Sequence, residues 1–270
     1  MVEWVRVGEV KLEVVAAGSG PPVVFSHGGA SDVRYWEPQR AAFVGAGYRF
    51  VAYSQRFRGR SRSAPNADAS AAAHARDLLG LLQSVGDGPV HVVGFSSAVA
   101  LRAAALDPSP FRTLTIIEPN VPWVLEGDPA GEEVLAWWRA ENERVRAVAG
   151  GDAERGAALW FELVEGRGPD RFAAQPAWFR GMWLEMFDRR GAAAPPPPES
   201  LTCEHLAGIA VPVLALGGEA SNRYSRAILP AVAACLPDVR LVTLPGATHF
   251  VSFQDPSAFN AAVLSFLADR

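Results

Sequence analysis

Short apolar runs bounded by turn residues recur along this chain and alternate with helical patterns, which constrains the fold more than any other feature. Each run has the length and composition of a buried strand. Helical patterns cover residues 69–86, 96–106 and 256–270. Because strands that alternate with helices form a parallel sheet covered on both faces, the chain predicts a doubly wound α/β fold. The predicted buried strands are residues 21–26, 48–54, 88–94, 113–119, 211–218 and 239–246, and an opening hairpin covers residues 3–18.

Composition limits the classes of partner. With 270 residues, of which 49% are hydrophobic and 20% charged, the chain can build one packed core. The formal net charge of −4 gives no overall attraction for phosphate backbones or anionic lipid, so nucleic acid is not an expected partner. No run of residues approaches a membrane-spanning length, and no membrane association is expected. The partner is therefore expected to be a small-molecule substrate, and the oligomeric state stays open.

The two cysteines and the first residues bear on location. Cys203 and Cys235 lack metal-ligand spacing, which favours a reducing compartment and argues against a disulfide scaffold. The opening MVEWVRVGEV alternates like a strand and lacks the basic and apolar regions of a secretory signal. We therefore expect a cytoplasmic protein.

The alternation breaks between residues 121 and 200. This stretch holds helical segments rich in tryptophan, followed by the stiff APPPPES. An inserted helical cap over residues 121–200 fits best, with residues 1–120 and 201–270 forming one core domain. Most of the tryptophans are expected to pack inside the cap, and some are expected to line a pocket. They are Trp123, Trp137, Trp138, Trp160, Trp178 and Trp183.

The stretch VVGFSSAVAL places two serines between a predicted strand and a predicted helix. A nucleophilic serine on such a tight turn needs small residues two positions before and two positions after it. For Ser96 these are Gly94 and Ala98, whereas for Ser97 they would be a phenylalanine and a valine. Ser96 is therefore the candidate nucleophile, although alanine stands where glycine is usual at the fifth position.

A serine hydroxyl needs a base near neutrality, and histidine suits that task. His249, in LPGATHF, lies in a loop at the sheet edge where the Ser96 turn also opens. His74, His91 and His205 are interpreted as packing or surface residues, and His27 as a brace for its own loop.

A developing oxyanion needs two hydrogen-bond donors. The glycines of SHGGA, residues 26–30, allow backbone N–H groups to approach a ligand closely. We assign the donors to the amides of Gly29 and Ser97, the second being the residue directly after the candidate nucleophile.

The sequence resembles the α/β-hydrolase superfamily over nearly its full length. The pieces that carry the resemblance occur in order: AGSGPPVVFSHGG, RFRGRS, GFSSA and LPGATH, with an insertion between TLTIIEPN and VPVLALGG. The resemblance implies an eight-stranded, mostly parallel sheet and a catalytic triad in the chain order serine, acid, histidine.

The acid of that triad departs from the family pattern. The resemblance implies an aspartate three residues beyond a glycine after the seventh strand, but Ser221 stands there. Either Glu219 reaches His249, or Glu118 supplies the carboxylate from the end of the sixth strand, or no acid is present. We prefer Glu118, because neighbouring strands lie about 4.8 Å apart and the longer glutamate side chain helps to span that gap.

A second departure is Ser54, where the family often has a structural aspartate. The loop that follows carries four alternating arginines, interpreted as a solvated loop rather than as a basic rim for an acidic substrate. They are Arg56, Arg58, Arg60 and Arg62.

These residues together predict a serine hydrolase that cleaves a small to medium, largely apolar carboxylic ester, lactone or thioester through an acyl-enzyme. Carbon–carbon bond hydrolysis and perhydrolysis use a similar triad and remain alternatives, as do a non-hydrolytic cyclase and a ligand-binding receptor with the same fold. No metal and no organic cofactor are expected, since the sequence holds neither a paired-histidine motif nor a phosphate-cradling loop with a lysine.

Overall fold

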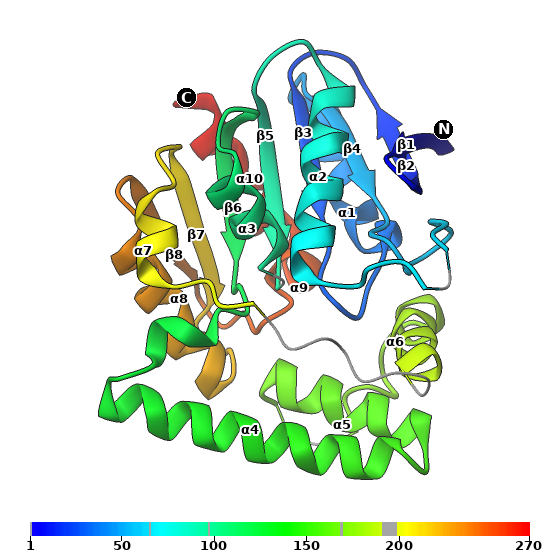
Figure 1. Cartoon of the computed structure of the whole chain (residues 1–270), viewed down its shortest axis with the longest axis vertical. Helices are drawn as coiled ribbons and strands as arrows, with labels where there is room; N and C mark the ends of the chain where they lie inside the picture. Colours follow the sequence, from blue (N-terminus) through cyan, green and yellow to red (C-terminus); the bar gives the residue numbers. More distant parts are fainter. Residues whose placement is uncertain (1, 65, 97, 168–169, 191–198) are drawn as a thin grey trace.

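Eight strands form a single sheet in the order β1-β2-β4-β3-β5-β6-β7-β8 (Figure 1). The computed structural model describes residues 2–64, 66–96, 98–167, 170–190 and 199–270. Strand β2 pairs antiparallel with β1 and with β4, and all later neighbours pair in parallel. The predicted α/β fold with a mostly parallel sheet is confirmed. The strands are β1 (Val2–Val7), β2 (Val10–Ala17), β3 (Pro22–Ser26), β4 (Arg49–Tyr53), β5 (Val90–Phe95), β6 (Phe111–Ile117), β7 (Val213–Gly218) and β8 (Val239–Leu244).

Helices cover both faces of this sheet. Along β3, Val24 belongs to one buried cluster, whereas Val23 and Phe25 belong to the other, because successive side chains of a strand point to opposite faces. The first cluster includes α2, α3, α7 and α8, and the second includes α1 and α10. The helices of the core are η1 (Val33–Trp36), α1 (Glu37–Gly45), α2 (Ala71–Val85), α3 (Val99–Leu106), η2 (Pro122–Leu125), α7 (Cys203–Ala207), α8 (Arg223–Cys235), α9 (Val251–Gln254) and α10 (Pro256–Ala268).

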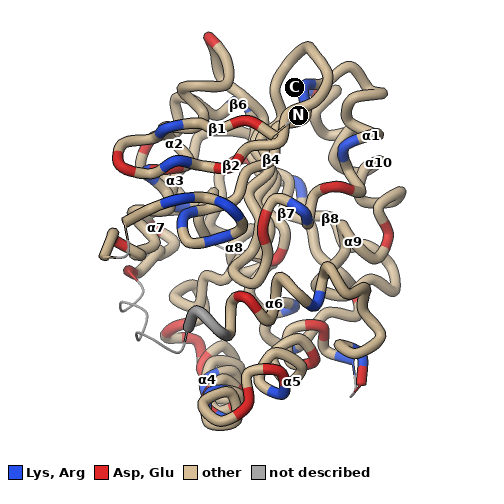
Figure 2. Tube along the Cα trace, turned by 90° about the vertical axis from the view of Figure 1, so that its right-hand side faces the viewer, with Lys and Arg blue, Asp and Glu red and all other residues tan. Residues whose placement is uncertain are grey.

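Of the helices that the described residues form between β6 and β7, we call three the cap helices: α4 (Pro129–Ala149), α5 (Ala153–Glu165) and α6 (Ala177–Arg190). They lie together beyond one end of the sheet (Figure 1). Asp128 and Asp152 cap the first two by accepting hydrogen bonds from backbone amides of the first turn. Basic and acidic residues are interspersed along α4 and α5 (Figure 2). The domain boundaries at residues 120 and 200 stay predictions.

The cap packs on the core through aromatic rings. Phe161 of α5 stacks on Phe250, the residue before α9, with ring centroids 5.1 Å apart. Phe179 and Trp183 of α6 also contact Phe250. Such ring pairs bury large apolar areas, so the cap is held at the end of the sheet by packing.

The structure corrects the interpretation of the cysteines. Cys203, at the start of α7, and Cys235, at the end of α8, form a disulfide with Cα atoms 5.0 Å apart. Spacing alone missed this pair because α7 packs against α8 only in the folded chain. The cysteines therefore give no argument for a reducing compartment, and a cytoplasmic location stays a prediction. In the part of the chain that the structure describes, no helix has both the length and the apolar character to cross a membrane.

The disulfide predicts a measurable contribution to stability. It joins cysteines 32 residues apart, and a crosslink of that span restricts the unfolded chain by about 3 to 4 kcal/mol in the chain-entropy model. We expect the double variant C203S/C235S to show a lower urea midpoint of unfolding. A reductant should shift the wild type to the same midpoint and leave the variant unchanged; equal midpoints for the oxidised wild type and the variant would contradict the expectation.

Candidate active site

A cavity of about 360 Å³ lies between the sheet and the cap helices. Its lining includes Ser96, Glu118 and His249, which follow three different strands. Ligand sites of parallel α/β sheets form outside the carboxyl ends of the strands, which is where these residues lie. Aromatic side chains form one part of the wall, and they include four of the tryptophans singled out in the sequence. The aromatic lining residues are Tyr35, Phe95, Trp123, Trp138, Trp160, Phe179, Trp183, Tyr224 and Phe250.

Ser96 occupies a strained turn between β5 and α3. Its φ of 58° lies in the left-handed region, which non-glycine residues rarely adopt. A Cβ on Gly94 would lie 2.6 Å from the Cβ of Ala100, so the strand and the helix approach too closely for a larger residue. A Cβ on Gly28 would lie 3.0 Å from the Cβ of Ser96. Small neighbours thus let the backbone present the Ser96 side chain to the cavity.

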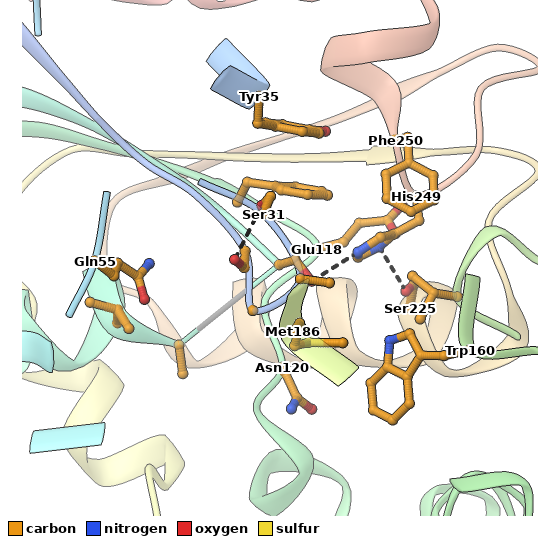
Figure 3. A pocket seen from close by; sticks show the side chains of 18 of the residues that line it. Ser31, Tyr35, Gln55, Glu118, Asn120, Trp160, Met186, Ser225, His249 and Phe250 are labelled. Atoms are coloured by element: carbon orange, nitrogen blue, oxygen red, sulfur yellow. Dashed lines mark hydrogen bonds and ion pairs between the residues drawn. The ribbon is translucent and has the colours of Figure 1, made fainter. Parts of the chain in front are cut away.

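His249 links Ser96 to Glu118. Its Nε2 lies 2.9 Å from Oγ of Ser96, and its Nδ1 lies 2.7 Å from Oε2 of Glu118. The ring is 4% exposed and packs against Phe95 and Phe250. Ser225 of α8 lies on the same side of the cavity, with Oγ 3.5 Å from Nδ1 (Figure 3). With Nδ1 donating to the carboxylate, the unprotonated Nε2 faces the serine hydroxyl.

Glu118 follows β6 directly, with φ at 41° and the side chain buried. Besides His249, its carboxylate accepts hydrogen bonds from the amide of Gly218, at 2.8 Å, and from the hydroxyl of Ser221. Burial alone would raise the pKa of the Glu118 carboxyl, but the interaction with His249 and these two hydrogen bonds hold the pKa below its usual range. Glu118 is therefore ionised near neutral pH.

Glu219, the competing candidate for the acid, points elsewhere. Its carboxylate is exposed and accepts a hydrogen bond from the amide of Gly246 at 2.9 Å. Ser221, at the position where the family pattern has aspartate, donates to Glu118. The structure thus brings Glu118, and not Glu219, to His249.

The two amides expected to bind an oxyanion differ in what the structure describes. Gly29 lines the cavity, and no hydrogen bond to its amide is found among the described residues. Ser97 lies outside the described residues. The neighbouring His27 accepts from the amide of Gln55 at its Nε2 and contacts the carbonyl of Gly28 with Nδ1, and burial lowers its pKa to about 4. This neutral imidazole braces the loop that carries Gly29.

The four alternating arginines of the loop after β4 make different contacts. Arg56 forms a buried ion pair with Asp77 at 2.6 Å, Arg60 lies 3.7 Å from Glu13, and Arg62 lies over the ring of Trp4. Arg58 lines the cavity. The interpretation as a solvated loop is therefore wrong for Arg56, which is buried, whereas Arg58 is half-buried in the cavity wall.

Several lining residues were not singled out in the sequence as part of the site. His74, interpreted as a packing residue, and Arg102 both line the cavity, as do Asn120, Tyr224 and Ser225. One signal was present for Arg102, since it is a single charge inside the apolar run AVALRAAAL directly after the Ser96 turn. Over the described ranges, no three His, Cys, Asp or Glu side chains form a group that could hold a metal ion.

Comparisons with known proteins agree with this architecture. The chain is 26% identical to 2-(acetamidomethylene)succinate hydrolase of Mesorhizobium japonicum, and the match spans 97% of this chain and 94% of that protein. A shorter match, 32% identical, covers 44% of this chain and 36% of an epoxide hydrolase of Caballeronia sordidicola. The solved structure of the esterase EaEST from Exiguobacterium antarcticum has the same fold, with a TM-score of 0.79 and 20% identity over 99% of this chain and 100% of that chain. The model of the alpha/beta hydrolase family matches residues 23–262. The chain therefore belongs to the alpha/beta hydrolase family.

Proposed function

We propose that the protein is a serine hydrolase that cleaves a small to medium, largely apolar carboxylic ester, lactone or thioester through an acyl-enzyme. The observation that carries the proposal is the continuous set of contacts from Ser96 through His249 to Glu118, at 2.9 Å and 2.7 Å. A serine hydroxyl becomes a nucleophile when a neighbouring base takes its proton.

In the first half of the proposed reaction, Oγ of Ser96 attacks the acyl carbon while Nε2 of His249 takes its proton. Glu118 accepts from Nδ1, keeps the ring in the productive tautomer and stabilises the imidazolium that forms. The amides of Gly29 and Ser97 donate to the oxyanion. His249 then returns the proton to the leaving group, and the acyl group stays on Ser96.

In the second half, water replaces the leaving group. His249 takes a proton from the water, which attacks the acyl carbon, and Ser96 regains its proton when the acid departs. A serine nucleophile does not suit epoxide opening, since attack on an sp³ carbon calls for a carboxylate that forms a hydrolysable ester. Ser96 therefore sets this chain apart from the mechanism expected of an epoxide hydrolase.

The cavity limits the substrate. A volume of about 360 Å³ accommodates a small to medium molecule, and the aromatic walls favour apolar acyl and leaving groups. Trp138 stacks on Tyr224 with ring centroids 4.4 Å apart, so this pair stabilises one part of the wall.

A fluorophosphonate probe tests the proposal. The probe should modify Ser96, identified by mass spectrometry of the peptide, and a panel of 4-nitrophenyl esters should be hydrolysed by the unmodified protein. The variant S96A should neither react with the probe nor turn the esters over. Normal folding of the wild type without labelling or ester turnover would favour a ligand-binding protein instead.

A further inference from the structure

Asn120 is an exposed polar residue in the cavity wall, beside the candidate nucleophile. It comes two residues after Glu118, and its side chain is among those that line the cavity (Figure 3). Its backbone amide donates to the carbonyl of Ser96 at 3.1 Å, so the two residues lie side by side. The contacts from Ser96 through His249 to Glu118 make no use of the Asn120 side chain.

Tyr224, at the start of α8, holds the side-chain amide of Asn120. Its hydroxyl donates to Oδ1 of Asn120 at 2.5 Å. The tyrosine is 4% exposed, and its ring stacks on Trp138 of the cap. Burial raises the pKa of the Tyr224 hydroxyl, so the group keeps its proton near neutral pH and acts as a donor.

The contact with Tyr224 determines which end of the amide stays free. The Tyr224 hydroxyl makes no other hydrogen bond within the described ranges. In the opposite orientation of the amide, Nδ2 would donate to this hydroxyl, and the hydroxyl proton would lie buried without an acceptor. Oδ1 therefore faces Tyr224. Nδ2 carries two N–H groups, and among the described residues neither has a partner.

We propose that Asn120 determines substrate specificity: its Nδ2 donates to a second carbonyl oxygen that the substrate carries in addition to the carbonyl under attack. The proposal rests on the proposed function of Ser96. Tyr224 is a positioning residue, because it acts only through the amide of Asn120. Since Asn120 lies beside Ser96, the second carbonyl lies within a few bonds of the acyl carbon.

The chemistry of this part of the cavity favours a neutral acceptor. A purely apolar substrate that covers Nδ2 would remove water from its N–H groups and offer no replacement, whereas a ketone or amide carbonyl supplies the missing acceptor. Asn120 carries no charge, and the ionised Glu118 lies two residues away. A neutral carbonyl therefore fits this position better than a carboxylate, which would be desolvated without a countercharge on Asn120.

Pairs of esters in which a carbonyl oxygen replaces a methyl group test this proposal. On the acyl side, 4-nitrophenyl 4-oxopentanoate is compared with 4-nitrophenyl 4-methylpentanoate. On the leaving-group side, 3-acetylphenyl butyrate is compared with 3-isopropylphenyl butyrate. The readout is the ratio of kcat/KM for the carbonyl compound to that for its hydrocarbon partner. A loss of active protein cancels from this ratio, and the intrinsic reactivity of each pair cancels when variants are compared.

We expect N120D to lower the ratio by roughly 5- to 100-fold on the side where the second carbonyl meets Asn120, the loss associated with an unpaired buried acceptor. The aspartate still accepts from the Tyr224 hydroxyl, but it presents a carboxylate where the wild type presents a donor. The matched control is N66D, which makes the same change at an exposed asparagine outside the cavity lining. It should leave the ratio unchanged.

The variant Y224F tests the positioning role of Tyr224. It keeps the ring that stacks on Trp138 and removes only the hydroxyl that holds Oδ1 of Asn120. The ratio should fall, but less than in N120D, because the amide is still present and no longer held in one orientation. An unchanged ratio in Y224F would overturn the role assigned to Tyr224.

A binding measurement separates this proposal from the proposed function. Calorimetry of S96A with both pairs of esters gives the preference for the carbonyl compound as a ratio of dissociation constants. This preference should fall by a similar factor in S96A/N120D, even if the wild type turned over no ester; that result would retain the contact and reject the hydrolase. Ratios of kcat/KM and of dissociation constants that N120D leaves unchanged on both sides would overturn the proposal and leave the hydrolase standing.

Discussion

Replacing Ser96 by alanine is expected to lower kcat for the best ester substrate by about 10⁶-fold, and H249A should cost about as much. The two residues act as one unit, because His249 takes the proton that Ser96 loses as it attacks. The double variant S96A/H249A should therefore be no slower than either single variant. Steady-state kinetics with the three variants checks this expectation.

Circular dichroism and urea unfolding of the same variants serve as controls, since neither substitution removes a large buried apolar side chain. Losses that multiply in the double variant would mean that the two residues act independently. That outcome would contradict a shared proton transfer between Nε2 of His249 and Oγ of Ser96.

The variant E118Q is expected to lower kcat by about 10⁴-fold, as removal of the acid does when the geometry of a triad is kept. A neutral amide neither fixes the tautomer of His249 nor stabilises the imidazolium. E219Q is the matched control and should change kcat little, because Glu219 is exposed and bonds the amide of Gly246.

A compensating variant sharpens this test. The hydroxyl of Ser221 already donates to the carboxylate of Glu118, so an aspartate at position 221 would place a negative charge next to position 118. We expect E118Q/S221D to recover part of the lost kcat. A large loss in E219Q together with normal turnover in E118Q would contradict the role proposed for Glu118.

The position of the triad acid, Glu118, could be predicted from the sequence. In the sequence, a serine at the position of the family aspartate and a glutamate at the end of the preceding strand were enough to favour Glu118. Ser54 is a second position where serine replaces a family aspartate and a carboxylate comes from a neighbouring strand. Its hydroxyl donates to the carboxylate of Glu13 on strand β2 at 2.9 Å. The partner of Ser54 was not predicted, because no motif marks Glu13 and the contact depends on the pairing of β2 with β4.

Local patterns predicted most of the sheet and the turn that carries Ser96. Helices α1 and α8 were not among the predicted elements, and α8 contains Pro230, a residue that usually argues against a helix interior. The disulfide and the packing of α2 against α3 both arise from helices that meet only after folding. The sequence predicted helical segments rich in tryptophan between residues 121 and 200, but which tryptophans line the cavity depends on how η2, α4, α5 and α6 pack on the core.

Direct observation of the acyl-enzyme tests the central claim most sharply. The wild type is mixed with 4-nitrophenyl butyrate, quenched with acid within milliseconds and digested, and the peptide that contains Ser96 is analysed by mass spectrometry. A butyryl group should form on Ser96 before steady state and disappear when the ester is consumed. Steady turnover of the ester by S96A, or an acyl group on another residue that forms and decays at the rate of turnover, would contradict it.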